Sequence, residues 1–323
     1  MNRRTGMIAL LGAIAATIAS AQRRRPRVGV LLPGSEDLYV AYVAALREGL
    51  ADAGRVEPAT LELVFRYSGG SNERLAALAR ELVAADVDAI VTSSTPAIRA
   101  AMAATSTIPI VFAAVADAVG SGLVASLAHP GGNVTGLTLL IPDLGAKQFE
   151  LLAEMIPGLQ RVGVLRGRGE GAQAFETIAA AIGAHGASAQ LVEVDAGDRI
   201  AAAFAQLRSA ASQALIVVDG PLLNGQRAAI ARLATAQRLP TLSTLRIYVD
   251  AGSLASYGPN LAAMWRRAGN GYVDRILKGT KPADLPVEQP TTFELVINLK
   301  TARALGMTIP QAIRTRAQVL IDE

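Results

Sequence analysis

Short apolar runs alternate with longer stretches of helical periodicity along this chain of 323 residues. In the first half, the apolar runs fall at residues 28–32, 61–65, 89–92, 110–114 and 134–138. Residues 38–53 and 71–85 carry apolar side chains at helical spacing between these runs. Continuous apolar runs are typical of parallel strands buried on both faces. The pattern therefore predicts an α/β fold in which strands alternate with helices.

The second half of the chain repeats the first. The pentapeptide RVGVL occurs at residues 27–31 and again at 161–165, and each copy precedes a glycine-bearing loop and a helical stretch. Further apolar runs fall at 190–194, 214–218, 240–242 and 253–256, with helical stretches at 172–185, 199–211 and 224–237. We predict two doubly wound, Rossmann-like lobes. Ligands of such sheets sit beyond the carboxyl ends of the strands, so the cleft between the lobes is the expected site.

The last part of the chain is too short to form a third core. It contains a helical stretch at 261–277, a polar connection at 278–290 and a strand candidate at 293–299. We predict that it crosses back between the lobes and completes both sheets. The expected division is an N-terminal lobe of residues 27–140 plus about 259–285, and a C-terminal lobe of residues 141–258 plus about 286–323.

Composition narrows the class of function. The hydrophobic fraction of 51% rests on aliphatic residues, since aromatic residues make up only 4%. The formal net charge of +4 falls to +2 if Arg3 and Arg4 are lost with a leader. That charge is too small for a nucleic-acid-binding surface, and the cluster Arg23, Arg24 and Arg25 is interpreted as a solvated tail.

Residues 1–21 have the pattern of an export signal. Two arginines precede an apolar core at 7–18, and Ala19, Ser20 and Ala21 supply small residues for cleavage. The core is shorter than the roughly 20 residues that span a membrane, and the pattern leaves open the Sec or twin-arginine route. The chain contains no cysteine, which excludes disulfides, thiolate metal sites and a lipid-anchored cysteine. We expect a soluble, periplasmic protein.

Three segments carry a family resemblance. They are residues 105–112 (TSTIPIVF), residues 122–136 with the motif PGGNVTG, and residues 276–298 with the motif FELVIN. Together they closely resemble the ABC transporter substrate-binding proteins of the TrpX-like group, over essentially all of the chain from residue 27. The group includes carriers of aromatic amino acids, and the motifs do not specify the solute.

The resemblance implies a type I periplasmic binding protein fold, with two lobes, a hinge and an inter-lobe ligand cleft. It implies a monomer that is not an enzyme, needs no cofactor, and delivers a small solute to an ABC permease and, through it, to the ATPase. We expect the solute to be an amino acid or a related organic acid. An alternative is an orphan binding protein that presents its ligand to a membrane sensor.

The leading binding candidates are Ser93, Ser94 and Thr95, which follow an apolar run and precede a helical stretch. Hydroxyls and free N–H groups at a helix N-terminus suit a carboxylate, although these residues could simply cap the helix. Asp219 stands at the corresponding point of the second half, where it could pair with a ligand ammonium. It could equally be a turn residue before Gly220.

Other candidates lie on further strand ends. Ser35 follows the first strand, Asp117 follows the run that ends at residue 115, and Tyr257 lies near a predicted crossing point. Tyr39 and Tyr42 rank below these three. A metal site and a catalytic set are not expected, because no acid, base and nucleophile combination stands out.

The loop after the second RVGVL departs from the family pattern. Relatives often carry asparagine and proline there, whereas this chain has Arg166 and Arg168 separated by glycine. A doubly basic lip would favour a ligand with an extra acid group and would put an aromatic amino acid in doubt. The alternative is an exposed glycine loop with solvated arginines.

Overall fold

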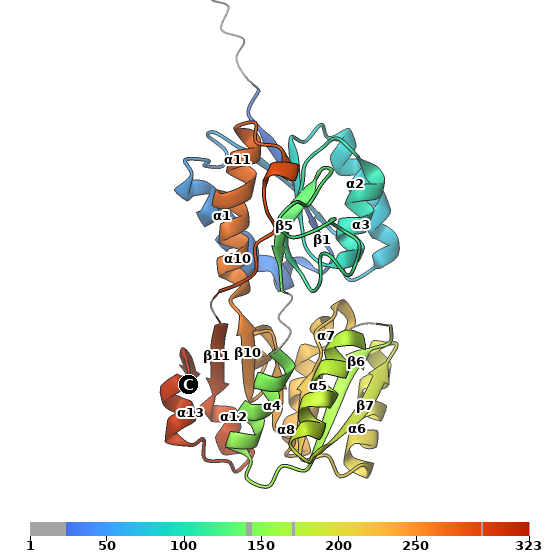
Figure 1. Cartoon of the computed structure of the whole chain (residues 1–323), viewed down its shortest axis with the longest axis vertical. Helices are drawn as coiled ribbons and strands as arrows, with labels where there is room; N and C mark the ends of the chain where they lie inside the picture. Colours follow the sequence, from blue (N-terminus) through green and yellow to red (C-terminus); the bar gives the residue numbers. More distant parts are fainter. Residues whose placement is uncertain (1–23, 140–143, 170–171, 292, 323) are drawn as a thin grey trace, which may run out of the picture.

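The structure is a computed structural model that describes residues 24–139, 144–169, 172–291 and 293–322. Two α/β lobes are stacked along the long axis of the molecule, with the N-terminal lobe uppermost in Figure 1. The predicted two-lobe fold is confirmed. The expected export signal at residues 1–21 lies outside the described residues.

The first lobe is a parallel sheet of five strands in the order β2-β1-β3-β4-β5. Its elements are β1 (Arg27–Leu32), α1 (Glu36–Asp52), β2 (Glu62–Tyr67), α2 (Asn72–Ala84), β3 (Ala89–Thr92), α3 (Thr95–Ala104), β4 (Ile110–Val115) and β5 (Val134–Thr138). This is a doubly wound order, in which the chain starts near the middle of the sheet and winds outward in both directions. The predicted strands match the observed ones to within two residues at each end.

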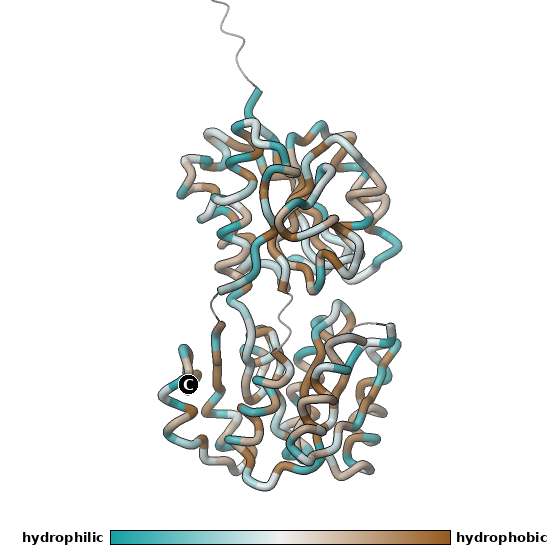
Figure 2. The backbone as a smooth tube through the Cα atoms, viewed as in Figure 1, coloured by the Kyte–Doolittle hydropathy of each residue, from teal (hydrophilic) through white to brown (hydrophobic). Residues whose placement is uncertain are grey.

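Alternation of side chains along each strand builds a core on both faces of this sheet. Val28, Val30 and Leu32 of β1 pack into the core under α1, whereas Leu31 packs into the core under α2 and α3. Figure 2 shows hydrophobic segments along the central strands and hydrophilic ones on the outer turns. Burial on both faces explains why these strands are continuous apolar runs in the sequence.

The second lobe contains a sheet of seven strands in the order β12-β11-β10-β9-β8-β6-β7. Its elements are α4 (Leu144–Met155), β6 (Arg161–Gly167), α5 (Ala172–Ala184), β7 (Ser188–Val194), η1 (Gly197–Arg199), α6 (Ile200–Ser209), β8 (Ala214–Val217), α7 (Pro221–Gly225), α8 (Arg227–Ala236), β9 (Thr241–Ser243), α9 (Ile247–Asp250) and β10 (Ala255–Pro259). Strands β7-β6-β8-β9-β10 repeat the order β2-β1-β3-β4-β5. The two RVGVL copies lie in β1 and β6, which hold equivalent places, so the predicted duplication extends to the topology.

The tail contributes helices to the first lobe and strands to the second. Its elements are α10 (Leu261–Arg267), the π-helical segment η2 (Ala268–Val273), α11 (Asp274–Leu277), η3 (Pro282–Asp284), β11 (Phe293–Asn298), α12 (Leu299–Ala304), α13 (Gln311–Arg316) and β12 (Val319–Ile321). The tail completes the second sheet with β11 and β12, whereas its pairing with the first sheet is confined to an isolated parallel bridge between Glu288 and Leu137. Strand β11 pairs antiparallel with β10, so the tail runs back through the second lobe beside the strand by which the chain left it.

The chain passes between the lobes after β5, after β10 and again before β11. The Tyr272 hydroxyl donates to the Pro286 carbonyl at 2.7 Å, and Glu288 forms an isolated parallel β-bridge with Leu137 of β5. Residues up to Glu288 therefore contact the first lobe, and we propose the last lobe boundary between Glu288 and Phe293. Across the described residues, no helix is both long and apolar enough to cross a membrane.

Candidate functional site

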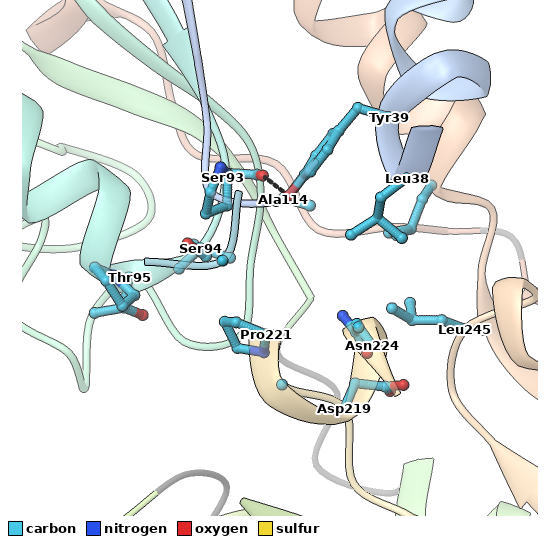
Figure 3. Close-up of a pocket in the computed structure, with 18 of the residues that line it drawn as sticks. Leu38, Tyr39, Ser93, Ser94, Thr95, Ala114, Asp219, Pro221, Asn224 and Leu245 are labelled. Atoms are coloured by element: carbon cyan, nitrogen blue, oxygen red, sulfur yellow. Dashed lines mark hydrogen bonds between the residues drawn. The ribbon is translucent and has the colours of Figure 1, made fainter. Parts of the chain in front are cut away.

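A cleft of about 810 Å³ lies between the carboxyl ends of the strands of the two lobes. Figure 3 shows its labelled lining residues, which are Leu38, Tyr39, Ser93, Ser94, Thr95, Ala114, Asp219, Pro221, Asn224 and Leu245. The parallel strands end at this edge of each sheet, so the loops that follow β3 and β8 face one another. This is the position that the doubly wound topology predicts for a ligand.

The loop between β3 and α3 has an unusual backbone at Ser94. Its φ of 66° and ψ of 146° form a conformation that L-residues rarely adopt, and such strain concentrates at functional sites. The Ser94 N–H donates to the Ala114 carbonyl at 3.1 Å, while the Ser94 side chain leaves the N-terminus of α3 uncapped. Its Oγ is buried without a hydrogen-bond partner. The loop thus presents a free hydroxyl and a helix N-terminus to the cleft.

The neighbouring hydroxyl of Ser93 is engaged with an aromatic residue. Ser93 Oγ and Tyr39 Oη lie 3.3 Å apart, as the dashed line in Figure 3 marks, and either can be the donor. Thr95 opens α3 and also lines the cleft. The structure therefore brings Ser93, Ser94 and Thr95 together at one wall, as their sequence positions suggested.

Asp219 faces this wall from the second lobe. It lies between β8 and Pro221 of α7, and its Oδ1 is buried without a hydrogen-bond partner. Burial raises the pKa of Asp219 from 3.8 to about 7, although the Thr244 hydroxyl and nearby backbone groups partly oppose this effect. A buried carboxyl group with a raised pKa ionises when a cation binds beside it, because the cation offsets the lost solvation of the negative charge.

Three aromatic residues form a wall beside these polar groups. Tyr39 lies edge-on to Tyr42 and to Trp265, with ring centroids 5.9 Å apart in both pairs, while Tyr42 stacks on Trp265 at 6.1 Å. All three line the cleft. Burial raises the pKa of Tyr39 to about 12 and that of Tyr42 further, and the nearby charge of Asp219 adds to the effect on Tyr42. These phenols are therefore neutral near pH 7.

An ion pair joins the lobes at the edge of the cleft. Arg227 Nη2 of α8 lies 3.4 Å from Asp37 Oδ2 of α1, and Arg227 also donates to the Asn224 carbonyl at 3.0 Å. Ser35 is exposed and donates to Asp37 through a short hydrogen bond. This bond and Arg227 hold the pKa of Asp37 below its usual value. Ser35 thus contributes to the contact between the lobes.

Replacing Asp37 with asparagine is expected to weaken ligand binding by at most about fivefold, because exposed ion pairs contribute little. The difference should shrink at 0.5 M salt, which screens exposed charges. Calorimetric titration at two salt concentrations measures both effects, with Glu36→Gln as the charge-matched control. An equal loss in the control, or a loss unaffected by salt, would show that the ion pair does not hold the lobes together.

Four predicted residues do not line the cleft. Asp117 Oδ1 accepts a hydrogen bond from the Gly120 N–H at 2.8 Å, so it stabilises its own turn. The Tyr257 ring stacks on Phe293 at 5.8 Å between the crossing strands. We remove both side chains from the proposed ligand contacts.

The two lip arginines are paired with acids of their own lobe and do not line the cleft. Arg166 Nη2 lies 2.9 Å from Glu193 Oε1, and Arg168 Nη1 lies 3.3 Å from Asp195 Oδ2. Strands β6 and β7 are paired in register, which places each arginine opposite or beside an acid that no sequence motif had linked to it. Gly169 lines the cleft, whereas residues 170 and 171 of the loop lie outside the described residues.

The family model for ABC transporter substrate binding proteins matches residues 27–321. The chain belongs to this family. The predicted resemblance is confirmed at that level, and a substrate-binding protein accounts for a cleft lined from two lobes. Among the described residues, no cluster of three His, Asp or Glu side chains could hold a metal ion.

Several relatives of this substrate-binding protein have names or solved structures. A tyrosine-binding protein from Clostridioides difficile is 27% identical over 263 residues, which cover 80% of this chain and 75% of the relative. An ABC domain from Streptococcus pneumonia, solved in complex with L-Trp, superposes with a TM-score of 0.85 at 28% identity and covers 92% of this chain and 100% of its own. A conserved domain protein from Vibrio cholerae gives the same TM-score and coverages at 29% identity.

Proposed function

We propose that this protein is the periplasmic solute-binding component of an ABC importer, and that its cargo is an L-amino acid with an apolar or aromatic side chain. In this proposal the two lobes close on the amino acid, and the closed form delivers it to the permease. Support comes from the family, from the names of the two amino-acid-binding relatives, and from the chemistry of the cleft. The proposed periplasmic location rests on the expected export signal at residues 1–21.

The observation that carries the proposal is a pair of unpartnered polar atoms in one cleft. Ser94 Oγ in the first lobe and Asp219 Oδ1 in the second lobe are both buried, and both lack a hydrogen-bond partner. Buried polar atoms without partners are rare, because each costs the desolvation of the group. Two of them at facing walls of a cleft indicate a ligand that supplies a hydrogen-bond acceptor at one end and a cation at the other.

Each atom suits one end of an α-amino acid. The N-terminus of α3 and the Ser94 hydroxyl can receive the carboxylate, since N–H dipoles and a neutral hydroxyl favour an anion without a cationic side chain. The Asp219 carboxylate can receive the ammonium in a charge-assisted hydrogen bond. Because the two groups belong to different lobes, a zwitterion satisfies both only when the cleft is closed.

The remaining walls suit an apolar cargo side chain. Leu38, Tyr42, Leu245 and Trp265 line the cleft near the polar groups. The lip arginines are paired with acids of their own lobe, so they no longer argue against an aromatic amino acid. We propose that the side chain of the cargo packs against this apolar wall, where buried area contributes affinity.

Thermal-shift and calorimetric titrations of the refolded protein without residues 1–21 test this proposal. The panel contains L-tryptophan, L-tyrosine and L-leucine, each with its N-acetyl derivative and its carboxamide. A parent amino acid should raise the melting temperature, because a ligand that binds only the folded form stabilises it. Both derivatives should lose at least about tenfold in affinity, since each removes one charge-assisted contact.

The outcomes separate the parts of the proposal. If an N-acetyl derivative binds as tightly as its parent, the pairing of the ammonium with Asp219 is wrong. If a carboxamide binds as tightly, the carboxylate site at α3 is wrong. If no amino acid of a wider panel binds, the proposed cargo class is wrong, although the family assignment stands.

A further inference from the structure

A buried glutamine joins the loop after β9 to strand β10 in the second lobe. Gln148 of α4 is only 2% exposed, and its Nε2 donates to Thr244 Oγ1 and to the Tyr257 carbonyl, both at 3.1 Å. A primary amide has two N–H groups, so both protons of Gln148 are used. The backbone carbonyl of Tyr257 makes this contact, while its ring stacks on Phe293.

The amide of Gln148 fixes the direction of the Thr244 hydrogen bond. Since Thr244 Oγ1 accepts from Gln148, its single proton is free to be donated elsewhere. Strands β8 and β9 pair in register with Val217 opposite Ser243, so the next residues along the two strands bring Thr244 close to Asp219. Burial raises the pKa of Asp219, and the Thr244 side chain and the backbone at residues 244 and 245 oppose that effect. Asp219 Oδ1 is buried and has no hydrogen-bond partner.

On the basis of the amino-acid-binding function above, we propose that Gln148 and Thr244 are positioning residues for the cargo ammonium. Gln148 orients the Thr244 hydroxyl, this hydroxyl donates to the Asp219 carboxylate, and Oδ1 is thereby presented to the cleft. Neither residue needs to touch the cargo. Both act by holding Asp219 in one rotamer and by favouring its ionised form, which is the form that binds an ammonium.

Three other titratable groups at the cleft do not change state near neutral pH. Tyr39 and Tyr42 on α1 stay protonated because burial raises their pKa values, and Asp37 stays ionised because its pKa is lowered. Arg227 on α8 is paired with Asp37, and Asp250 of α9 is paired with Arg246. Asp219, whose pKa is about 7, therefore controls the pH dependence of ammonium binding.

The sign of that dependence follows from linkage. Below pH 7 the empty cleft holds Asp219 protonated, so ammonium binding must first release a proton. Affinity for an amino acid should rise about tenfold from pH 6 to pH 8 and level off above that. Loss of the Thr244 hydroxyl should move the midpoint of this rise upward, because a donor to the ionised carboxylate has been removed.

Three variants test the positioning role. Thr244→Val removes the hydroxyl at nearly constant volume, Thr244→Ser retains it, and Thr241→Val is the matched control. Thr241 is a buried threonine of the same sheet, and its hydroxyl bonds the Leu239 carbonyl. The first readout is the pKa of Asp219 in the empty protein, from a carboxyl ¹³C titration in which Asp219→Asn identifies the signal. The second is the affinity for L-tryptophan between pH 5.5 and pH 8.5.

Thr244→Val should raise the pKa of Asp219 by about one unit and weaken L-tryptophan binding about tenfold at pH 7. Thr244→Ser and Thr241→Val should keep the pKa of the parent protein. Gln148→Leu should shift it in the same direction as Thr244→Val, and the double variant should add nothing, because the two residues act in series.

An unchanged pKa of Asp219 in Thr244→Val, or an equal change in Thr241→Val, would overturn the positioning role. The titration uses the empty protein, so it decides this question even if L-tryptophan fails to bind. Failure of every amino acid to bind the parent protein would instead contradict the proposed function.

Discussion

Replacing Asp219 with asparagine is expected to weaken amino-acid binding by at least about a hundredfold at pH 8, because the cargo ammonium loses its only proposed anionic partner. In the empty protein the same substitution should raise stability at pH 8. Both results have one cause, which is that Oδ1 of the buried carboxylate has no partner in the empty protein. An unpaired buried charge in an empty binding site lowers the free energy of unfolding.

The direction of the stability effect follows from the pKa of Asp219. The pKa in the folded protein is about 7, above the ordinary value of 3.8. The folded state therefore keeps a proton that the unfolded state has lost, and stability falls as the pH rises from about 4 to about 7. Above pH 7 the ionised side chain lowers the free energy of unfolding by up to about 4 kcal/mol. Asparagine resembles the protonated form, so it removes this penalty.

Urea unfolding of the empty parent and variant proteins at pH 5 and pH 8 measures the effect. The variant should gain up to about 4 kcal/mol in the free energy of unfolding at pH 8 and little at pH 5. Asp117→Asn is the matched control, because Asp117 follows a strand of the other lobe and bonds its own turn outside the cleft. If Asp219→Asn binds amino acids like the parent protein, or loses stability at pH 8, the assigned role of Asp219 is wrong.

Replacing Gly49 with alanine is expected to lower the free energy of unfolding by about 3 kcal/mol or more. A Cβ at Gly49 of α1 would lie 2.0 Å from the Arg266 carbonyl oxygen of α10. Opposite it, a Cβ at Gly269 of η2 would lie 2.8 Å from the Leu46 carbonyl oxygen. These are backbone atoms of helices, so neither can move aside cheaply. The tail helix that enters the first lobe after β10 must separate from α1 to make room.

Thermal unfolding followed by circular dichroism tests this packing. Gly183→Ala is the control, because Gly183 lies in α5 with open space around its Cα and an ordinary backbone conformation. Alanine there should be neutral or stabilise by up to about 1 kcal/mol, since it has the higher helix propensity. Equal melting temperatures for Gly49→Ala and the parent protein would contradict the close approach of α1 to the tail.

The predicted helix at 261–277 shows what periodicity can and cannot reveal. Its apolar spacing correctly indicated a helical region, but the region is α10, a π-helical segment and α11 in succession. Gly269 and Gly271 lie within the π-helical segment, where Gly269 faces α1. A glycine in a helical stretch lowers helix propensity, and the sequence gives no indication that another helix packs against it.

Some residues of the site were predictable from the sequence and others were not. Ser93, Ser94, Thr95 and Asp219 were predictable, because each follows a buried apolar run and parallel strands end at one edge of a sheet. Trp265 resembles a core residue in the sequence, and Gln148 and Thr244 belong to no motif. They bear on the site because α4, the loop after β9 and the returning tail come together in space.

The strands and the strand ends that form the cleft walls were predictable from the sequence, because burial on both faces of a parallel sheet leaves continuous apolar runs in the chain. The repeated pentapeptide and the PGGNVTG and FELVIN motifs likewise indicated the duplication and the family. The polar groups that remain unpartnered in the cleft could be identified only from the folded chain. Arg166 and Arg168 are neutralised by Glu193 and Asp195 of the neighbouring strand, whereas Ser94 and Asp219 keep unpartnered atoms. Partners distant in sequence decide these outcomes, since hydrogen bonds and ion pairs depend on distances that only the folded chain sets.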